Sequence, residues 1–123
     1  MAAARKRSKK NAALTAARVR ELALAFPESQ EGSHMSHPDF RVRNKIFATL
    51  NGAETMVNVK IDPANLDALL RSEPDLYKDV WAGRWLGMEI SRVDADSLRN
   101  LLEDAWCLTA PKALLKQYQR PAE

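Results

Sequence analysis

The sequence has few of the residues that commonly form disulfides, metal sites or catalytic centres. Its 123 residues include one cysteine, two histidines and four glycines. A single cysteine, Cys107, excludes an internal disulfide and is typical of a reducing compartment, so we expect a cytoplasmic protein. No apolar run approaches the roughly 18 residues that a membrane span needs, and no signal-peptide core is evident. We therefore expect no contact with a membrane.

Sequence motifs for enzymatic chemistry are also missing. There is no glycine-rich phosphate loop, and neither Ser33 nor Ser36 lies in the strand-turn-helix context of a nucleophile. Cys107 lies in an apolar stretch, where a buried thiol is usually inert. Glu103 and Asp104 are adjacent on a predicted helix and do not face one another. The sequence therefore predicts a protein that is not an enzyme and needs no cofactor.

Both histidines, His34 and His37, fall in the segment EGSHMSHPDFRVRNKIFATL at residues 31–50. Gly32 and Pro38 disfavour a helix there, and along one strand positions three apart point to opposite faces. Neither a cysteine nor a convincing acidic partner completes a zinc ligand set. We therefore predict no metal site and interpret the histidines as polar residues of a hairpin.

The positive charge of the chain is unevenly placed. The formal net charge is +3 and the isoelectric point is about 9.2. Five basic residues lie in the first ten positions: Arg5, Lys6, Arg7, Lys9 and Lys10. The rest of the chain has 14 basic and 16 acidic residues, a net charge of −2. This pattern predicts a disordered basic arm at residues 1–12 and a near-neutral domain at 13–120. Proteins that bind duplex DNA tightly through the domain itself usually carry more positive charge.

Hydrophobic periodicity predicts the elements of one domain. A helix is expected from Thr15 to the stop at Pro27, followed by strands near residues 40–43, 45–50 and 55–61. A second helix is predicted after its N-cap, Asp62. Two further strands are expected at 77–81 and 85–90, a helix from Asp94 and a short helix at 112–118. The predicted fold is an α+β two-layer sandwich in the order α-β(3)-α-β(2)-α, with helices on one face of an antiparallel sheet.

A candidate binding surface follows from alternation along these strands. If Phe40 and Val42 face the helices, then Arg41 and Arg43 face the open side of the sheet. The same argument adds Lys60 and Trp85, and Lys45 is a further candidate because it lies at the turn. Basic side chains beside an aromatic ring suit phosphate contact and base stacking. The alternative is an ordinary solvated sheet face with Trp85 packed beneath a loop or a helix.

Several segments, taken in order, resemble the MmcQ/YjbR family. They are LALAFPES at residues 22–29, HPDFRVRNKIFATL at 37–50, a proline-capped helix after the Val-Lys-Ile strand, Trp81 and Trp85 around Gly83, and LLEDAWCLTAPK at 101–112. The resemblance covers residues 14–118. It implies a fold similar to CyaY-like and secretion-chaperone-like proteins and a "double wing" DNA-binding motif. It supplies no catalytic motif.

Two functions from different classes remain open at this point. The first is weak DNA binding through the basic sheet face, with a salt-sensitive contribution from the basic arm. The second is a chaperone-like module that uses the same sheet to bind a protein partner. An enzyme or ligand carrier is a third and lesser possibility, because no convergent acid–base set is present.

Overall fold

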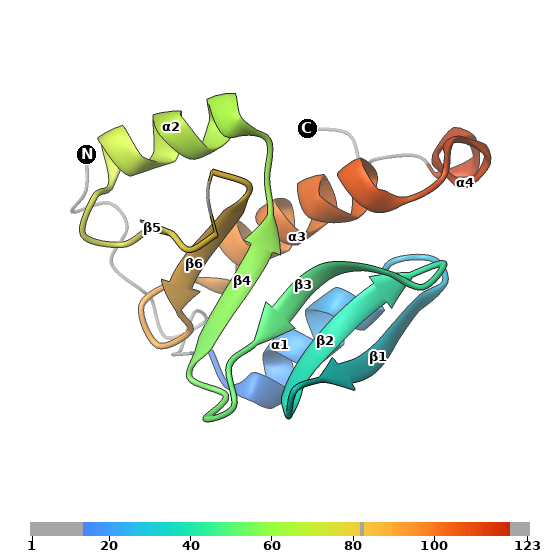
Figure 1. The fold of residues 1–123 in the computed structure, drawn as a ribbon, viewed down its shortest axis with the longest axis horizontal. Helices are drawn as coiled ribbons and strands as arrows, with labels where there is room; N and C mark the ends of the chain where they lie inside the picture. The colour runs from blue at the N-terminus through green and yellow to red at the C-terminus, as the bar shows by residue number, and fades with distance from the viewer. Residues whose placement is uncertain (1–13, 82, 119–123) are drawn as a thin grey trace.

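The computed structural model describes residues 14–81 and 83–118 of the chain (Figure 1). The elements are α1 (Ala16–Leu24), β1 (Ser29–His34), β2 (His37–Val42), β3 (Lys45–Leu50), β4 (Met56–Lys60), α2 (Pro63–Ser72), β5 (Lys78–Asp79), β6 (Trp85–Glu89), α3 (Ala95–Thr109) and α4 (Lys112–Gln117). The strands form one sheet in the order β1-β2-β3-β4-β6-β5, and every neighbouring pair is antiparallel.

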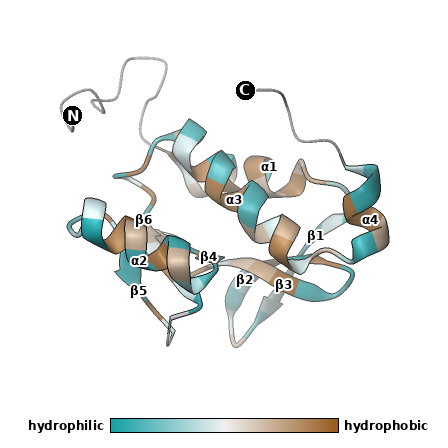
Figure 2. Cartoon of the chain, turned by 90° about the horizontal axis from the view of Figure 1, so that it is seen from above, coloured by the Kyte–Doolittle hydropathy of each residue, from teal (hydrophilic) through white to brown (hydrophobic). Residues whose placement is uncertain are grey.

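The predicted α+β two-layer architecture is confirmed. Helices α1 and α3 lie side by side on one face of the sheet, as the view from above shows (Figure 2). The opposite face of the sheet points toward the viewer in Figure 1 and carries no described helix. We call this surface the open face. None of the described helices is long and apolar enough to cross a membrane.

The element order differs from the prediction by one strand. Four strands, not three, precede α2, because Ser29–His34 forms the edge strand β1. Its sequence, SQEGSH, contains no hydrophobic residue, so no alternation reveals it. The strand is specified by its pairing with β2, which runs in unbroken register from Ser29 opposite Val42 to His34 opposite His37.

Local hydrogen bonds explain where the longer helices begin. The hydroxyl of Thr15 accepts a hydrogen bond from the backbone N–H of Arg18, and α1 starts at Ala16, directly after Thr15. The carboxylates of Asp62 and Asp94 cap α2 and α3 in the same way. Each cap satisfies a backbone donor that the first helical turn leaves unpaired. The sequence predicts the caps at Asp62 and Asp94 from residue type, and it predicts the start of α1 near Thr15.

The core lies between the sheet and the helices α1 and α3. The largest fully buried side chains are Trp106, Phe40, Phe47, Leu50, Leu86, Met88, Leu98 and Leu102. Trp106 stacks on Phe26 with ring centroids 6.1 Å apart, and its indole N–H donates to the carbonyl of Pro27 over 3.1 Å. This contact joins α3 to the segment that follows α1. Both helices pack on the same face of the sheet, and no described helix covers the other face.

A network of ion pairs fastens α1 to the sheet at its margin. The Arg20 guanidinium donates two bonds to Glu54, of 2.9 and 3.0 Å, and its Nε contacts both carboxylate oxygens of Glu31 at 3.1 Å. Arg20 belongs to α1, Glu31 to β1, and Glu54 to the turn after β3. One guanidinium therefore connects three parts of the fold.

Candidate functional site on the open face

A row of small residues crosses the centre of the open face. Asp39, Thr49, Asn58 and Gly87 stand opposite one another on β2, β3, β4 and β6. The three polar side chains are buried, although no described helix covers this face. Asn58 donates a hydrogen bond to the hydroxyl of Thr49 over 3.1 Å. The open face therefore differs from the uniformly solvated surface that alternation predicts, because neighbouring side chains cover the polar residues at its centre.

Gly87 shows how closely these neighbours pack. A Cβ atom at this position would lie 2.6 Å from Cγ1 of Val80 and 2.8 Å from Oδ1 of Asn58. Both distances are shorter than any normal contact, so only glycine fits without movement. The absent side chain lets Val80 cover β6.

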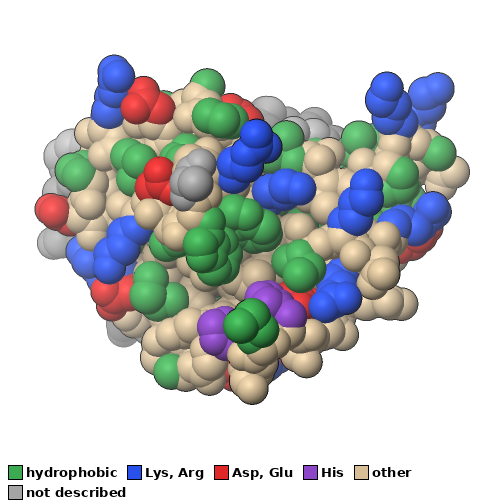
Figure 3. Space-filling model, in the orientation of Figure 1, with side chains coloured by type: hydrophobic (Ala, Val, Ile, Leu, Met, Phe, Trp, Pro, Cys, Tyr) green, Lys and Arg blue, Asp and Glu red, His purple; other side chains and the backbone are tan. Residues whose placement is uncertain are grey.

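Two tryptophans form an exposed aromatic pair on this face. Trp81 and Trp85 meet edge to face, with ring centroids 5.4 Å apart and planes at 85°. Trp85 is half-buried, and 47% of Trp81 is exposed. Figure 3 shows a hydrophobic group near the centre of the open face with Lys and Arg side chains beside it. The two rings therefore expose aromatic surface to solvent and are not part of the buried core.

Lys60 lies next to this aromatic pair. It stands directly opposite Trp85 across the β4–β6 ladder, so the predicted placement of the two residues on one face is confirmed. Within the described part of the chain, no ion pair or hydrogen bond engages the Lys60 ammonium. A free cation beside an aromatic ring is suited to an anionic ligand that also has a flat face.

Arg41 also lies on the open face, but its guanidinium is paired with a carboxylate of the protein itself. Its Nε and Nη2 donate to the two carboxylate oxygens of the buried Asp39, over 2.7 and 3.0 Å. The bonds from Arg41, together with one involving His34, hold the pKa of the Asp39 carboxyl below its usual value. Gly32 makes room for this pair, because a Cβ there would lie 3.0 Å from Arg41 Nε and from Asp39 Oδ1. Arg41 therefore neutralises a carboxylate of its own strand.

The predicted placement of Arg43 on the open face is wrong. Strand β2 ends at Val42, and Arg43 occupies the turn with Asn44, where both residues have positive φ. The Arg43 guanidinium pairs with Glu28 through Nε and Nη2. Lys45 opens β3 opposite Val42 and is exposed. The basic residues of the predicted arm, Arg5, Lys6, Arg7, Lys9 and Lys10, lie outside the described residues.

The two histidines are polar residues of a hairpin, as the sequence predicts, but the expectation that they point to opposite faces is wrong. His34 is the last residue of β1 and His37 the first of β2, and they face each other across a two-residue turn. Met35 and Ser36 form this turn with φ angles of 49° and 68°. The histidines therefore point to the same side, with ring centroids 5.9 Å apart. Alternation within one strand does not apply to this pair, because His34 and His37 lie on two paired strands. Among residues 14–81 and 83–118, no three His, Cys, Asp or Glu side chains group as metal ligands.

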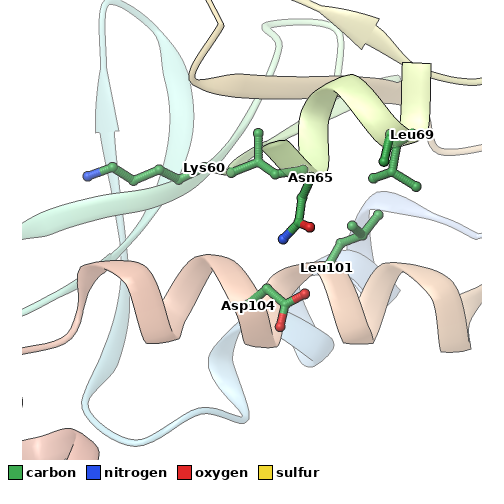
Figure 4. Close-up of a pocket in the computed structure, with 7 residues that line it drawn as sticks. Lys60, Asn65, Leu69, Leu101 and Asp104 are labelled. Carbon is green, nitrogen blue, oxygen red and sulfur yellow. The ribbon is translucent and has the colours of Figure 1, made fainter. Parts of the chain in front are cut away.

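A pocket opens beside the sheet, between α2 and α3 (Figure 4). Its volume is about 260 Å³, and it is lined by Lys60, Ile61, Asn65, Ala68, Leu69, Leu101 and Asp104. In Figure 4, Asn65 extends from α2 toward α3, while the Lys60 amine points away from Asp104. Asn65 donates to Asp62 over 2.7 Å. The volume lies below the range of most ligand sites, and the lining offers a small apolar group a place to bind.

Comparisons with known proteins agree on family and fold. A family model described as YjbR matches residues 24–108, which include all six strands. The crystal structure of Deinococcus radiodurans protein DR2400, with the family-model domain DUF419, is similar with a TM-score of 0.73 and 19% identity. The similarity covers 85% of this chain and 88% of that chain. No curated protein matches the chain.

Proposed function

The chain belongs to the YjbR family, and on this premise we propose that it is a non-enzymatic protein that binds DNA with the open face of its sheet. The observation that carries the proposal is the exposed Trp81–Trp85 pair with the unpaired Lys60 opposite Trp85. Stacking of a base on an aromatic ring contributes roughly 1–3 kcal/mol and tolerates any base sequence.

The charges favour single-stranded DNA over duplex DNA. Arg41 and Arg43 are engaged by Asp39 and Glu28, so neither of these two guanidinium groups is free to follow a duplex backbone. Duplex recognition relies mainly on phosphate contacts, whereas single strands offer unstacked bases to aromatic side chains. We therefore propose that the aromatic pair supplies most of the sheet's affinity. The basic arm adds a salt-sensitive contribution that is independent of sequence.

The test is a titration of labelled single-stranded and duplex DNA with the full-length protein, followed by fluorescence anisotropy at low and moderate salt. Trp81→Ala should weaken single-strand binding at least fivefold, because a stacking surface is lost. Lys60→Gln should weaken binding and lower its salt dependence, because a phosphate contact is lost. Leu108→Ala and Lys112→Gln are matched controls, since both residues are exposed on helices away from this face.

A further variant separates the arm from the sheet. In full-length protein, the five basic arm residues are replaced by glutamine, and the titration is repeated. If this variant loses all binding while Trp81→Ala keeps it, the arm alone binds DNA and the proposed role of the sheet is wrong. An absence of binding by the unaltered protein at low salt would rule out DNA binding altogether.

A protein-binding module is the second candidate, favoured by apolar exposure. Trp81 and Met35 are 47% and 88% exposed, so both side chains are accessible to a protein partner. This function predicts a complex whose stability depends weakly on salt. Sizing chromatography at two salt concentrations, combined with pull-down by the Trp81→Ala variant, distinguishes it from DNA binding.

A further inference from the structure

We propose that His34 and His37 form a binding site for a divalent transition-metal ion, with Cu²⁺ bound most tightly. The site lies at the β1–β2 turn, apart from the Trp81–Trp85 pair, and the proposal does not depend on DNA binding. Three observations support it: the separation of the rings, the partner of His34, and the accessibility of both imidazoles.

The separation of the two rings suits a shared ion. Their centroids are 5.9 Å apart, and the ring planes are tilted by 57°. A metal–imidazole nitrogen bond measures about 2.0–2.1 Å, so two imidazoles on one ion place their centroids about 5 to 6 Å apart. The β1–β2 ladder holds His34 directly opposite His37, so the two imidazoles extend from neighbouring positions on the same face of the sheet.

The carboxylate partner of His34 is the arrangement found behind many metal-binding histidines. Nδ1 of His34 lies 2.8 Å from Oδ2 of Asp39. An ionised carboxylate in this position accepts a hydrogen bond from Nδ1–H, which leaves the lone pair of the neutral ring on Nε2, directed away from Asp39. Asp39 is itself fixed by two bonds from Arg41. The geometry therefore sets both the tautomer and the orientation of His34 before any ion arrives.

His37 has no such partner. None of the hydrogen bonds found among residues 14–81 and 83–118 involves its ring nitrogens, so either nitrogen is available to an ion. Both histidines are partly exposed, and Figure 3 shows their side chains together at the surface of the open face. Water fills the remaining coordination positions. Two imidazoles suit Cu²⁺, Ni²⁺ and Zn²⁺, and Cu²⁺ binds nitrogen ligands most strongly of the three.

The test is calorimetric titration of untagged, full-length protein with Cu²⁺ and with Zn²⁺ in the presence of glycine as a weak competing chelator. We expect one ion per chain, with Cu²⁺ bound more tightly than Zn²⁺. His34→Ala and His37→Ala should each weaken Cu²⁺ binding at least tenfold. Asp39→Asn should weaken it by roughly 10- to 100-fold, as loss of a carboxylate behind a metal-binding histidine commonly does.

Gln30→Ala is the matched control, because Gln30 is an exposed residue of β1 at the other end of the strand. Circular dichroism of each variant establishes that the fold is intact. In the Cu²⁺ complex, electron paramagnetic resonance should show coupling to two imidazole nitrogens, and to one in either single-histidine variant. Unchanged affinity in both histidine variants, or equal losses in Gln30→Ala, would overturn the proposal.

Discussion

The Nε of Arg41 donates a hydrogen bond to Oδ1 of Asp39 over 2.7 Å, although the two residues are only two positions apart on the same strand. Both side chains point to the open face, where Asp39 is buried beneath the guanidinium. The pair therefore removes one positive charge from a surface that strand alternation predicts to be basic. It also provides the fixed carboxylate that orients His34.

Replacing Asp39 should destabilise the fold in a pH-dependent way. Asp39→Asn is expected to lower the free energy of unfolding by about 2 kcal/mol at pH 7, because hydrogen bonds to a charged group are lost. Since the folded-state pKa of Asp39 is depressed, its stabilisation is present above the unfolded value of about 3.9 and disappears as the pH falls through the folded value. Urea unfolding at pH 7 and near pH 3 should show the difference between the two proteins shrinking in acid.

Asp67→Asn is the control for that experiment. Asp67 pairs with Arg71 one turn along α2, and both side chains are largely exposed. Such pairs contribute about 0.5 kcal/mol or less. Equal losses in the two variants would show that the burial of Asp39 has no special consequence.

Gly87→Ala should destabilise the protein by about 1–3 kcal/mol, the usual result of overpacking. The new methyl group would collide with Val80 and with the Asn58 side chain. Adding Val80→Ala should restore part of the loss, because it removes the shorter of the two contacts. At Gly52 a Cβ atom would have only an ordinary contact, 3.9 Å from His37, so Gly52→Ala should change stability little. Thermal unfolding of the variants measures these differences.

The ion pairs that Arg20 of α1 forms with Glu31 and Glu54 should contribute more to the free energy of unfolding than the Arg18–Glu21 pair of the same helix. Arg20→Gln is expected to lower the free energy of unfolding by about 1–2 kcal/mol, because charge-assisted bonds to two carboxylates are lost. Arg18→Gln removes a largely exposed pair with Glu21 and should cost about 0.5 kcal/mol at most. Guanidinium chloride would screen both pairs, so urea is the suitable denaturant. A larger effect at Arg18 would contradict the bridging role.

Tyr118 should ionise later than an exposed tyrosine. Burial raises the pKa of its phenol, and the bond that it donates to Glu103 over 2.6 Å adds to the effect. A raised folded-state pKa gives stability that is complete below the unfolded value of about 10 and is lost as the pH rises through the folded value. Absorbance at 295 nm during an alkaline titration should show a late component that Tyr118→Phe abolishes. A titration that the variant leaves unchanged would contradict this assignment.

The sequence predicts those features that depend on neighbouring residues. Thr15, Asp62 and Asp94 cap helices because a short polar side chain reaches the backbone two or three residues ahead. Alternation likewise placed Lys60 and Trp85 on one face, since both lie in strands with clear apolar partners. Strand β1 escaped prediction because a strand without apolar residues has no such pattern.

Residue types and periodicity by themselves determined the two-layer α+β fold, because the two hydrophobic periods specify which side of each helix and strand is buried. Only the tertiary structure decided which charges remain free and that the two histidines meet. Those outcomes depend on strand register and on where each turn begins, and a repeat of two residues does not specify either. Arg41 meets Asp39, Arg43 meets Glu28, and Lys60 lies unpaired beside Trp85 for that reason.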